Sequence, residues 1–391
     1  MSIIVLGGDG FLGWPLSVKL ALRFPEEKIL IVDNMNRRRL TKEVGGGSLV
    51  PILPLPERIE AFRRIYKQDN LDHVHADVTT SDLDSILREV RPSIIYHLAQ
   101  QASASYSMKG IDEALFTLVN NEQGNMRLLW GMHMYTPDAH LIKLGSFGEY
   151  AKSNIDICEG YFHPEYNGIK ADSPMPYPRA SDDIYHITKI NDSNFIGMAC
   201  RKWGLRVTEI MQATVVGTAT EEISKHPDLF TRFDYDHVFG TVLHRFLTQV
   251  LSGHPLSIYG SGHQRTGLMG LRDSITSMAD LAGRPADVGE HRVINHVTER
   301  HYSINELAQY VKDIAGQKGY EVQFCRGNHD PRDENIPEKR HYKIASAYID
   351  EFVKQTPLEV IIQEILDHLE PYRSRVDETT LPPSVMWRKT C

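Results

Sequence analysis

Cysteine is scarce in this chain, with four residues among 391 and no Cys-x-x-Cys spacing. The scattered positions of Cys158, Cys200, Cys325 and Cys391 exclude a disulfide framework and a cysteine zinc site. Isolated thiols of this kind are typical of the reducing cytosol. The 18 histidines are dispersed in the same way, so we expect no bound metal.

The chain also lacks long runs of basic residues and long runs of apolar residues. The net charge is −8 and no long basic run occurs, which argues against a nucleic-acid surface. No apolar run has the length of a membrane span, and the first residues lack the charged flank of a signal peptide. We therefore expect a cytoplasmic protein without a nucleic-acid or membrane partner.

The start of the chain carries a glycine-rich turn. The apolar segment 3–6 predicts a buried parallel strand, and residues 14–24 predict a helix directly after the turn. Glycines spaced Gly-x-x-Gly-x-x-Gly between a strand and a helix allow a tight turn and let the backbone approach a pyrophosphate at the helix N-terminus. The segment therefore predicts a dinucleotide site, with expected contacts from Gly7, Gly10, Phe11, Leu12 and Gly13.

An acidic residue follows at the spacing that such a site requires. The second apolar run, Ile29–Val32, ends in Asp33, twenty residues after Gly13. A carboxylate at this position accepts hydrogen bonds from both hydroxyls of an adenine ribose and repels a 2′-phosphate. Arg37 to Arg39 follow closely and argue for NADP. Asp33 stands nearer the expected ribose position, so the sequence favours NAD.

Strands and helices alternate along the first half of the chain. Further strands are expected at 73–76, 93–98, 140–144 and 206–211, with helices near 57–67, 81–90, 114–135 and 183–200. This alternation predicts an α/β fold, a Rossmann-type doubly wound parallel sheet. We expect the NAD-binding domain, with the catalytic residues, at 1–217. A smaller, mainly substrate-binding region is expected at 218–371, with some segments returning to the sheet. Residues 372–391 should form a mobile or partner-clasping tail.

Tyr185 and Lys189 are four residues apart in the expected helix 183–200, so both side chains should share one face. A nearby ammonium favours a phenolate, which predicts a lowered pKa for Tyr185 and a role as general base. Ser146 follows an expected strand at the edge where ligands bind in parallel sheets. A second Tyr-x-x-x-Lys pair, Tyr166 and Lys170, encloses Asn-Gly, which predicts a surface turn.

Several further blocks of sequence make a resemblance specific. They include Tyr106-Ser107-Met108, Lys143-Leu144-Gly145-Ser146, Gly148-Glu149-Tyr150, Lys202-Trp203-Gly204 and Arg232-Phe233-Asp234-Tyr235-Asp236. With the glycine turn and the Tyr185/Lys189 pair, they cover roughly residues 1–345. The chain resembles the extended short-chain dehydrogenases/reductases that act on nucleotide sugars, the NAD-dependent epimerase/dehydratase family. Within them it is most similar to the UDP-sulfoquinovose synthases.

The resemblance implies transient oxidation of a nucleotide sugar at C4 by NAD. Tyr185 would take the proton of the 4-hydroxyl, Ser146 would share its hydrogen bond, and Lys189 would bind the nicotinamide ribose. Glu149 would remove the proton at C5. Further cofactor contacts implied are Asn34, Arg37, Asp77, Val78, Ala99 and Asn121, and substrate contacts are Gln101, Gln212, Arg265, Arg272 and Arg332. The expected assembly is a homodimer.

Departures from the resembling enzymes decide the expected outcome of the reaction. Sulfoquinovose synthases read Glu-Gln-Arg where this chain reads Gln100-Gln101-Ala102, and their Gln-Thr-Arg-Gly block has become residues 264–267, Gln-Arg-Thr-Gly. A sulfite-using enzyme needs cationic groups for its anion. Phe147-Gly148 stands where 4,6-dehydratases carry Asp-Glu.

These departures predict an enzyme that epimerises its sugar. The first alternative is a UDP-sulfoquinovose synthase, which joins sulfite to UDP-glucose. The second alternative is a catalytically idle NAD-binding scaffold or sensor, because folds of this kind can lose their chemistry.

Overall fold

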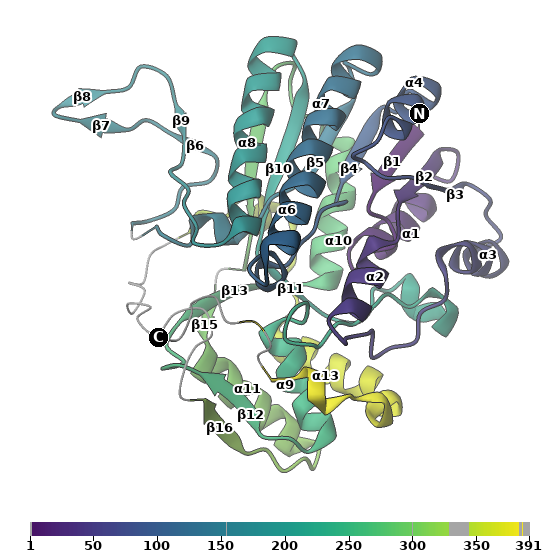
Figure 1. Ribbon diagram of the computed structural model, residues 1–391, viewed down its shortest axis with the longest axis vertical. Helices are drawn as coiled ribbons and strands as arrows, with labels where there is room; N and C mark the ends of the chain where they lie inside the picture. The colour runs from purple at the N-terminus through teal and green to yellow at the C-terminus, as the bar shows by residue number, and fades with distance from the viewer. Residues whose placement is uncertain (1, 154, 299, 328–343, 383–384, 386–391) are drawn as a thin grey trace.

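A seven-stranded parallel sheet forms the centre of the protein (Figure 1). The computed structural model of the chain describes residues 2–153, 155–298, 300–327, 344–382 and 385. The sheet has the order β14-β10-β5-β4-β1-β2-β3, so the strand order reverses between β1 and β4. Its strands are β1 (Ser2–Leu6), β2 (Lys28–Asp33), β3 (Leu71–His75), β4 (Ile94–His97), β5 (His140–Leu144), β10 (Arg206–Gln212) and β14 (His291–His296). Such a reversal marks the crevice where doubly wound sheets bind ligands.

Both faces of the sheet are covered, as the apolar strands require. In β1, Ile3 and Val5 point to one core, and Ile4 and Leu6 point to the other. This two-residue alternation is the strand period, and helices on both sides bury it. The first core is covered by α1 (Gly13–Arg23), α3 (Leu55–Tyr66) and α10 (Leu271–Asp280), and the second by α4 (Asp82–Val90), α7 (Gly124–Tyr135) and α8 (Ile184–Trp203).

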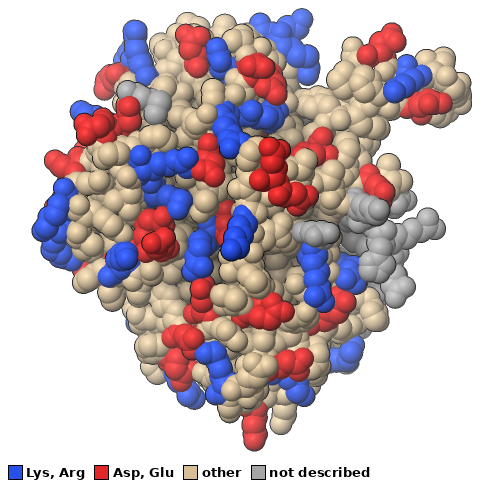
Figure 2. Space-filling view, turned by 180° about the vertical axis from the view of Figure 1, so that it is seen from behind, with Lys and Arg blue, Asp and Glu red and all other residues tan. Residues whose placement is uncertain are grey.

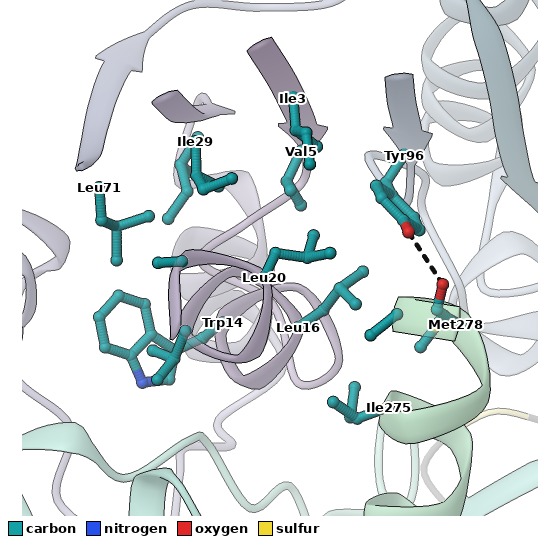
Figure 3. Close-up of a cluster of buried hydrophobic side chains, with 14 of the residues drawn as sticks. Ile3, Val5, Trp14, Leu16, Leu20, Ile29, Leu71, Tyr96, Ile275 and Met278 are labelled. Carbon is teal, nitrogen blue, oxygen red and sulfur yellow. Dashed lines mark hydrogen bonds between the residues drawn. The ribbon is translucent and has the colours of Figure 1, made fainter. Parts of the chain in front are cut away.

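Figure 3 shows the first core between the sheet and helices α1 and α10. Leu16 and Leu20 of α1 lie beneath the side chains of β1 and are fully buried. On the neighbouring strand β4, the hydroxyl of Tyr96 donates a 2.8 Å hydrogen bond to the carbonyl oxygen of Met278 in α10. This bond satisfies a buried polar group, so α10 is fixed against the sheet although it comes late in the chain.

A smaller region with its own core lies beyond the carboxyl ends of the strands (Figure 1). It comprises α9 (Val242–Ser252), β12 (Leu256–Tyr259), β13 (Arg265–Gly270), β15 (His301–Ser303), α11 (Ile304–Gln317), β16 (Phe324–Gly327) and α13 (Leu358–Leu369). Ser303 and Glu306 form a capping box at the start of α11. Two segments from beyond residue 217, α10 and β14, return to the sheet layer.

The chain after residue 371, expected to form a mobile or partner-clasping tail, packs against the smaller region over the residues that the structure describes. Leu381 is fully buried in the core of the smaller region. The backbone N–H of Asp377 donates a 2.9 Å hydrogen bond to the hydroxyl of Tyr235, and Nε of Arg375 donates to the carbonyl of Leu49 at 3.0 Å. The segment forms short 3₁₀ turns at 370–375 and 378–380, which give no apolar period in the sequence. Single anchoring side chains hold it in place.

The expected helix 114–135 is interrupted by one π-helical turn. Helix α6 (Ile111–Leu118) passes through the turn Val119–Gln123 into α7. A π turn inserts one residue into a helix, and such turns are frequent at functional sites. Periodicity alone cannot reveal it, because both flanks keep the apolar spacing of an ordinary helix.

The pair Tyr166 and Lys170 lies on an arm that projects from the protein (Figure 1). Strands β7 (Glu165–Tyr166) and β8 (Ile169–Lys170) pair through a two-residue turn, in which Asn167 and Gly168 both have positive φ. The side chain of Tyr166 is 81% exposed. The expected surface turn is confirmed, and this pair takes no part in the crevice.

The surface carries charges of both signs. Figure 2 shows lysine and arginine side chains interspersed with aspartate and glutamate over the back of the protein. Within the described residues, no helix has the length and apolar character needed to cross a membrane. The same part of the chain contains no group of three or more His, Cys, Asp or Glu side chains placed to hold a metal ion.

Candidate active site

The glycine turn between β1 and α1 has the geometry of a dinucleotide cradle. Gly7 adopts a φ of +86°, and a Cβ atom there would lie 2.7 Å from the backbone nitrogen of Ala99. A Cβ atom on Gly13 would lie 2.1 Å from the carbonyl oxygen of Gly7. Side chains at either position would fill the cradle, so only glycine lets the turn close against Ala99 and the helix start. Gly10, Phe11 and Leu12 lie within the same turn.

Asp33 ends β2 beside the glycine turn. One carboxylate oxygen accepts a 2.8 Å hydrogen bond from the backbone N–H of Asp9, and the other accepts one of 2.7 Å from Met35. Burial and the charge of Asp9 raise the pKa of Asp33. Asn34 donates a 2.8 Å hydrogen bond to Asp77. Asp33 and Asp77 are thus linked through Asn34 beside the glycine turn, and their contact with the adenosine of the cofactor stays a prediction.

Two other expected cofactor residues are held by protein groups. Arg37 donates to Asp234, with 2.7 Å between Nη2 and Oδ2. Asn121, in the π turn, is fully buried; its amide donates to the carbonyl of Gln101 and to Thr188, and its oxygen accepts from the N–H of Gln101. Asn121 therefore ties the loop after β4 to helix α8. Val78 is buried against Gly124 at the start of α7.

Ser146, Tyr185 and Lys189 come together beyond the end of β5. Ser146 follows β5 directly, and Tyr185 and Lys189 stand one turn apart near the start of α8, which Asp183 caps. The Nζ atom of Lys189 lies 5.6 Å from the centre of the Tyr185 ring and donates a 2.7 Å hydrogen bond to the carbonyl of Leu144. The expected spatial grouping is therefore present.

The expected effect of Lys189 on Tyr185 needs correction. In this structure burial and the charge of Glu149 raise the pKa of Tyr185, although a hydrogen bond with Ser146 lowers it. Burial and the neighbouring Lys143 lower the pKa of Lys189 itself. A lysine whose own charge is disfavoured stabilises a phenolate poorly. The protein side chains alone thus leave Tyr185 protonated.

A histidine that sequence reasoning missed contacts the serine. Nδ1 of His186 donates a 2.6 Å hydrogen bond to Asp183, so Nε2 is free to accept the hydroxyl proton of Ser146 at 3.1 Å. The hydrogen bond to His186 counters the effect of burial and lowers the pKa of Asp183. A Cβ atom on Gly148 would lie 2.1 Å from the His186 ring, so the absence of a side chain there admits the imidazole. The Asp-x-x-His spacing at the start of the expected helix was the available signal.

Glu149 does not face the crevice as a base at C5 would. It is fully buried, and one oxygen accepts a 2.8 Å hydrogen bond from the N–H of Ser146. The other oxygen pairs with Arg179 at 3.0 Å. Glu149 therefore completes a capping box that fixes the backbone of Ser146. The geometry corrects the expected catalytic role to one of positioning.

Behind these residues lies a buried ionic network. Lys143 pairs with Asp192 at 3.3 Å and with Glu209 at 3.2 Å, and all three side chains are fully buried. Gln100 links Asp192 to Lys189 by donating to the first and accepting from the second. The network thus holds Lys189 through Gln100.

Most of the expected substrate residues have other partners. Gln101 bonds the backbone of Ser103 and the hydroxyl of Thr117. Gln212 is buried among Ser274 and His296. Both side chains thus have partners inside the protein, and their contact with a substrate stays a prediction from the resemblance.

The expected arginines are not gathered in the crevice. Arg265 pairs with Glu306 at 3.0 Å and donates to the carbonyl of His301. Arg272 pairs with Glu364 of α13 at 3.0 Å and is exposed. Arg332 lies outside the described residues. A sequence motif cannot tell which way such long side chains turn.

The protein has the features of an NAD-binding enzyme of the short-chain dehydrogenase/reductase class. These are a Rossmann sheet, a glycine cradle, a carboxylate at the end of β2 and a Ser-Tyr-Lys group. Residues 3–295 match the NAD dependent epimerase/dehydratase family, and the chain belongs to that family. NAD is accordingly its cofactor.

Curated relatives cover the whole chain. UDP-sulfoquinovose synthase of Sulfolobus acidocaldarius is 35% identical over 395 residues, which cover 100% of this chain and 98% of that protein. The chloroplastic UDP-sulfoquinovose synthase of Spinacia oleracea is 34% identical over 390 residues, covering 99% of this chain and 79% of the relative. The resemblance seen in the sequence is thereby confirmed.

Solved structures share the fold. A UDP-glucuronic acid 4-epimerase from Bacillus cereus, in complex with UDP-glucuronic acid and NAD, superposes with a TM-score of 0.67 at 17% identity, covering 95% of this chain and 99% of that one. UDP-glucose 4-epimerase from Thermotoga maritima, with UDP-glucose, gives 0.65 at 19% identity, with coverage of 95% and 99%. The predicted fold class is confirmed.

Proposed function

We propose that this enzyme binds a uridine diphosphate sugar and oxidises it at C4. The support is the grouping of Ser146, Tyr185 and Lys189 at the strand ends, together with relatives named for UDP-sugars. NAD, when bound, supplies the acceptor for the hydride that leaves C4. Gly7, Gly13 and Asp33 hold the cofactor. Lys189 would bind and orient it. The phenolate of Tyr185 would be favoured by the positive charge of the oxidised nicotinamide and could then accept the proton of the 4-hydroxyl.

We further propose a second proton transfer, at C5, carried by His186. Oxidation at C4 acidifies the C5 proton. A base that removes this proton must lie near C5, the carbon next to the one that carries the 4-oxygen. His186 contacts Ser146 through Nε2, and Asp183 holds the other nitrogen, so the ring is oriented toward the serine. Glu149 is unsuited because Arg179 and the backbone of Ser146 occupy its oxygens.

Chemistry at C5 favours a reaction of the sulfoquinovose-synthase type, since the relatives that match the full chain carry that name. An enzyme that only inverts C4 has no need of a second base. The observation that carries this proposal is the Asp183–His186–Ser146 chain of hydrogen bonds.

Epimerisation is the second candidate, and one observation favours it. Ala102 stands where the resembling synthases have arginine, and Arg265 is committed to Glu306. Without the charge of that arginine, a sulfite anion would approach a diphosphate-bearing substrate against repulsion. A C5 carbanion can be reprotonated from the opposite face, which gives an epimer without sulfur.

One experiment separates these outcomes. The protein is incubated with UDP-glucose, NAD and labelled sulfite in deuterated water, and products are followed by NMR. We expect deuterium at C5 and a sulfonated sugar nucleotide with the wild type, and neither with His186→Asn. Deuterium at C5 with an epimer establishes the second candidate. UDP-galactose with the C5 proton retained contradicts the role of His186. No conversion of a panel of nucleotide sugars would indicate an idle scaffold.

We also propose a homodimer, formed through helices α6, α7 and α8. These neighbouring helices carry large apolar side chains that are exposed in the single chain: Ile111 72%, Leu115 51%, Trp130 50%, Met134 62% and Ile187 38%. Apolar surface of this kind marks protein interfaces. Leu115→Lys should shift the mass measured by light scattering from dimer to monomer. An unchanged mass in that variant, with a dimeric wild type, would exclude this face.

A further inference from the structure

The run Arg37-Arg38-Arg39 follows β2 and would suit the 2′-phosphate of NADP, yet each arginine has a carboxylate partner. Arg37 pairs with Asp234 at 2.7 Å, and Arg39 pairs with Glu43 on the surface of its own helix, α2 (Asn36–Glu43). Arg38 pairs with Asp9 through two hydrogen bonds of 2.6 and 2.8 Å. Each of the three arginines is thus paired with a different carboxylate.

Asp9 is the partner that lies closest to the cofactor cradle. It belongs to the glycine turn, is 1% exposed, and its N–H donates to the carboxylate of Asp33 at 2.8 Å. The charge of the Asp9 carboxylate is also close enough to raise the pKa of Asp33, so two carboxylates are neighbours where Asp33 is expected to receive the adenosine ribose. The second would stand beside a 2′-phosphate, if one entered, and like charges in a partly buried site repel strongly.

Asp9 also restrains two guanidinium groups. Asp9 accepts hydrogen bonds from Nε and Nη2 of Arg38, and Nη2 also donates a 2.7 Å hydrogen bond to the carbonyl of Leu53. Arg58 is fully buried, contacts Asp9 through Nη2 and lies over the Trp14 ring, 4.4 Å from its centre. Among the described residues, its Nε and Nη1 have no hydrogen-bond partner. Asp9 is thus the counter-ion of a buried cation and cannot turn away from Arg38 without leaving Arg58 unpaired.

We propose that Asp9 determines the preference of this enzyme for NAD over NADP, by holding Arg38 away from a 2′-phosphate and by placing a second negative charge beside Asp33. The inference rests on the assignment of Asp33 to the adenosine ribose. Bidentate guanidinium groups are the usual ligands of phosphate. Arg38 is one quarter exposed and adjoins the site, so it is the arginine available once Asp9 loses its charge.

The experiment measures the dissociation constants of NAD and NADP by calorimetry on cofactor-free protein. In Asp9→Asn, we expect the ratio of the two constants to move toward NADP by about tenfold or more, because a charge-assisted hydrogen bond is gained and a repulsion removed. Glu43→Gln is the matched control: it frees Arg39, which is half exposed, and should leave the ratio unchanged. An unchanged ratio in Asp9→Asn would overturn the proposal, as would an equal change in Glu43→Gln.

Two double variants secure the test. Asp9→Asn with Arg58→Met removes the buried cation together with its counter-ion, so it keeps the charge balance if the single variant does not fold. It should show the same shift toward NADP. Asp9→Asn with Arg38→Ala should lose most of that shift, and retention of the full shift would contradict the role of Arg38. Asp33→Ala, measured in parallel, tests the ribose assignment separately: if it leaves NAD binding intact, that assignment fails whatever Asp9 does.

Discussion

The imidazole of His186 and the hydroxyl of Ser146 lie 3.1 Å apart, although the two residues come from a helix and a strand end that are 40 positions apart in the chain. Asp183 caps that helix with one oxygen and orients the imidazole with the other. Helix capping and orientation of a base are thus done by one carboxylate. Proton transfer at this end of the sheet therefore depends on how helix α8 begins.

Replacing the phenol of Tyr185 should abolish turnover and leave the cofactor bound. Tyr185→Phe removes the proton acceptor without removing a group that anchors NAD, and loss of general-base catalysis typically costs about 10²–10⁴-fold in rate. The rate is measured with the nucleotide sugar found to be converted, and bound NAD by mass spectrometry of the denatured protein. Tyr166→Phe, on the projecting arm, should behave like the wild type. The reverse pattern would show that the other Tyr-x-x-x-Lys pair is catalytic.

Removing the carboxylate of Asp33 should weaken NAD binding without unfolding the protein. Asp33→Ala loses charge-assisted hydrogen bonds to the ribose, so the binding free energy should fall by about 1.5–3 kcal/mol. Calorimetry gives the affinity, and circular dichroism checks that the fold is intact. NAD affinity equal to that of the wild type would remove Asp33 from the cofactor site.

Glu149→Gln should reduce stability before anything else. The substitution leaves Arg179 without one of its buried anionic partners, and breaking a buried ion pair typically costs about 3–5 kcal/mol. Urea unfolding measures the loss. Glu165→Gln, on the exposed arm, should change stability by no more than about 0.5 kcal/mol. A stable Glu149→Gln protein that had lost only deuterium exchange at C5 would restore Glu149 as the base.

Acid should destabilise the protein partly through His296. Burial lowers the pKa of His296 from its ordinary value of 6.5 to about 3, and the ring lies between Gln212 and Ser277, hydrogen-bonded to both. Between these pH values the imidazole of His296 is protonated in the unfolded chain and neutral in the folded protein. Stability is therefore lost as the pH falls below about 6.5, at about 1.4 kcal/mol per pH unit for one such group.

The variant His296→Gln should lower the slope of stability against pH by that amount between pH 6 and 4, as measured by urea unfolding. The exposed His163 offers a control, since we expect His163→Gln to leave the slope unchanged. A slope in His296→Gln that equals the wild-type slope would mean that His296 is already protonated in the folded protein.

Local spacing was sufficient to predict the parts of the site that adjoin one another in sequence. The glycine turn, Asp33, and the Tyr185/Lys189 pair are each set by a strand end or one helical turn, and the structure has them there. Strand β14 was missed because its outer residues, His291 and Arg292, are polar and conceal the strand pattern.

The sequence could not predict the direction in which each side chain points. Glu149, Gln101 and Gln212 stand at positions close to the crevice, but each turns toward unsatisfied backbone or polar groups inside the protein. Some of those groups come from segments remote in sequence, such as Arg179 for Glu149 and Ser274 for Gln212, so their need for partners cannot be read from a motif. His186 was missed for the related reason that Gly148 makes room for it from another element.

The π turn at Val119–Gln123 makes the helix through α6 and α7 intolerant of changes in length. Asn121 reaches both the loop after β4 and Thr188 of α8 only because one additional residue is accommodated at this point. Deletion of a single residue between positions 119 and 123 would restore an ordinary α-helix and turn Asn121 by about 100° around its axis. This point can therefore accept substitutions but not deletions. Loss of even one residue would separate the loop after β4 from α8, the helix that carries Tyr185.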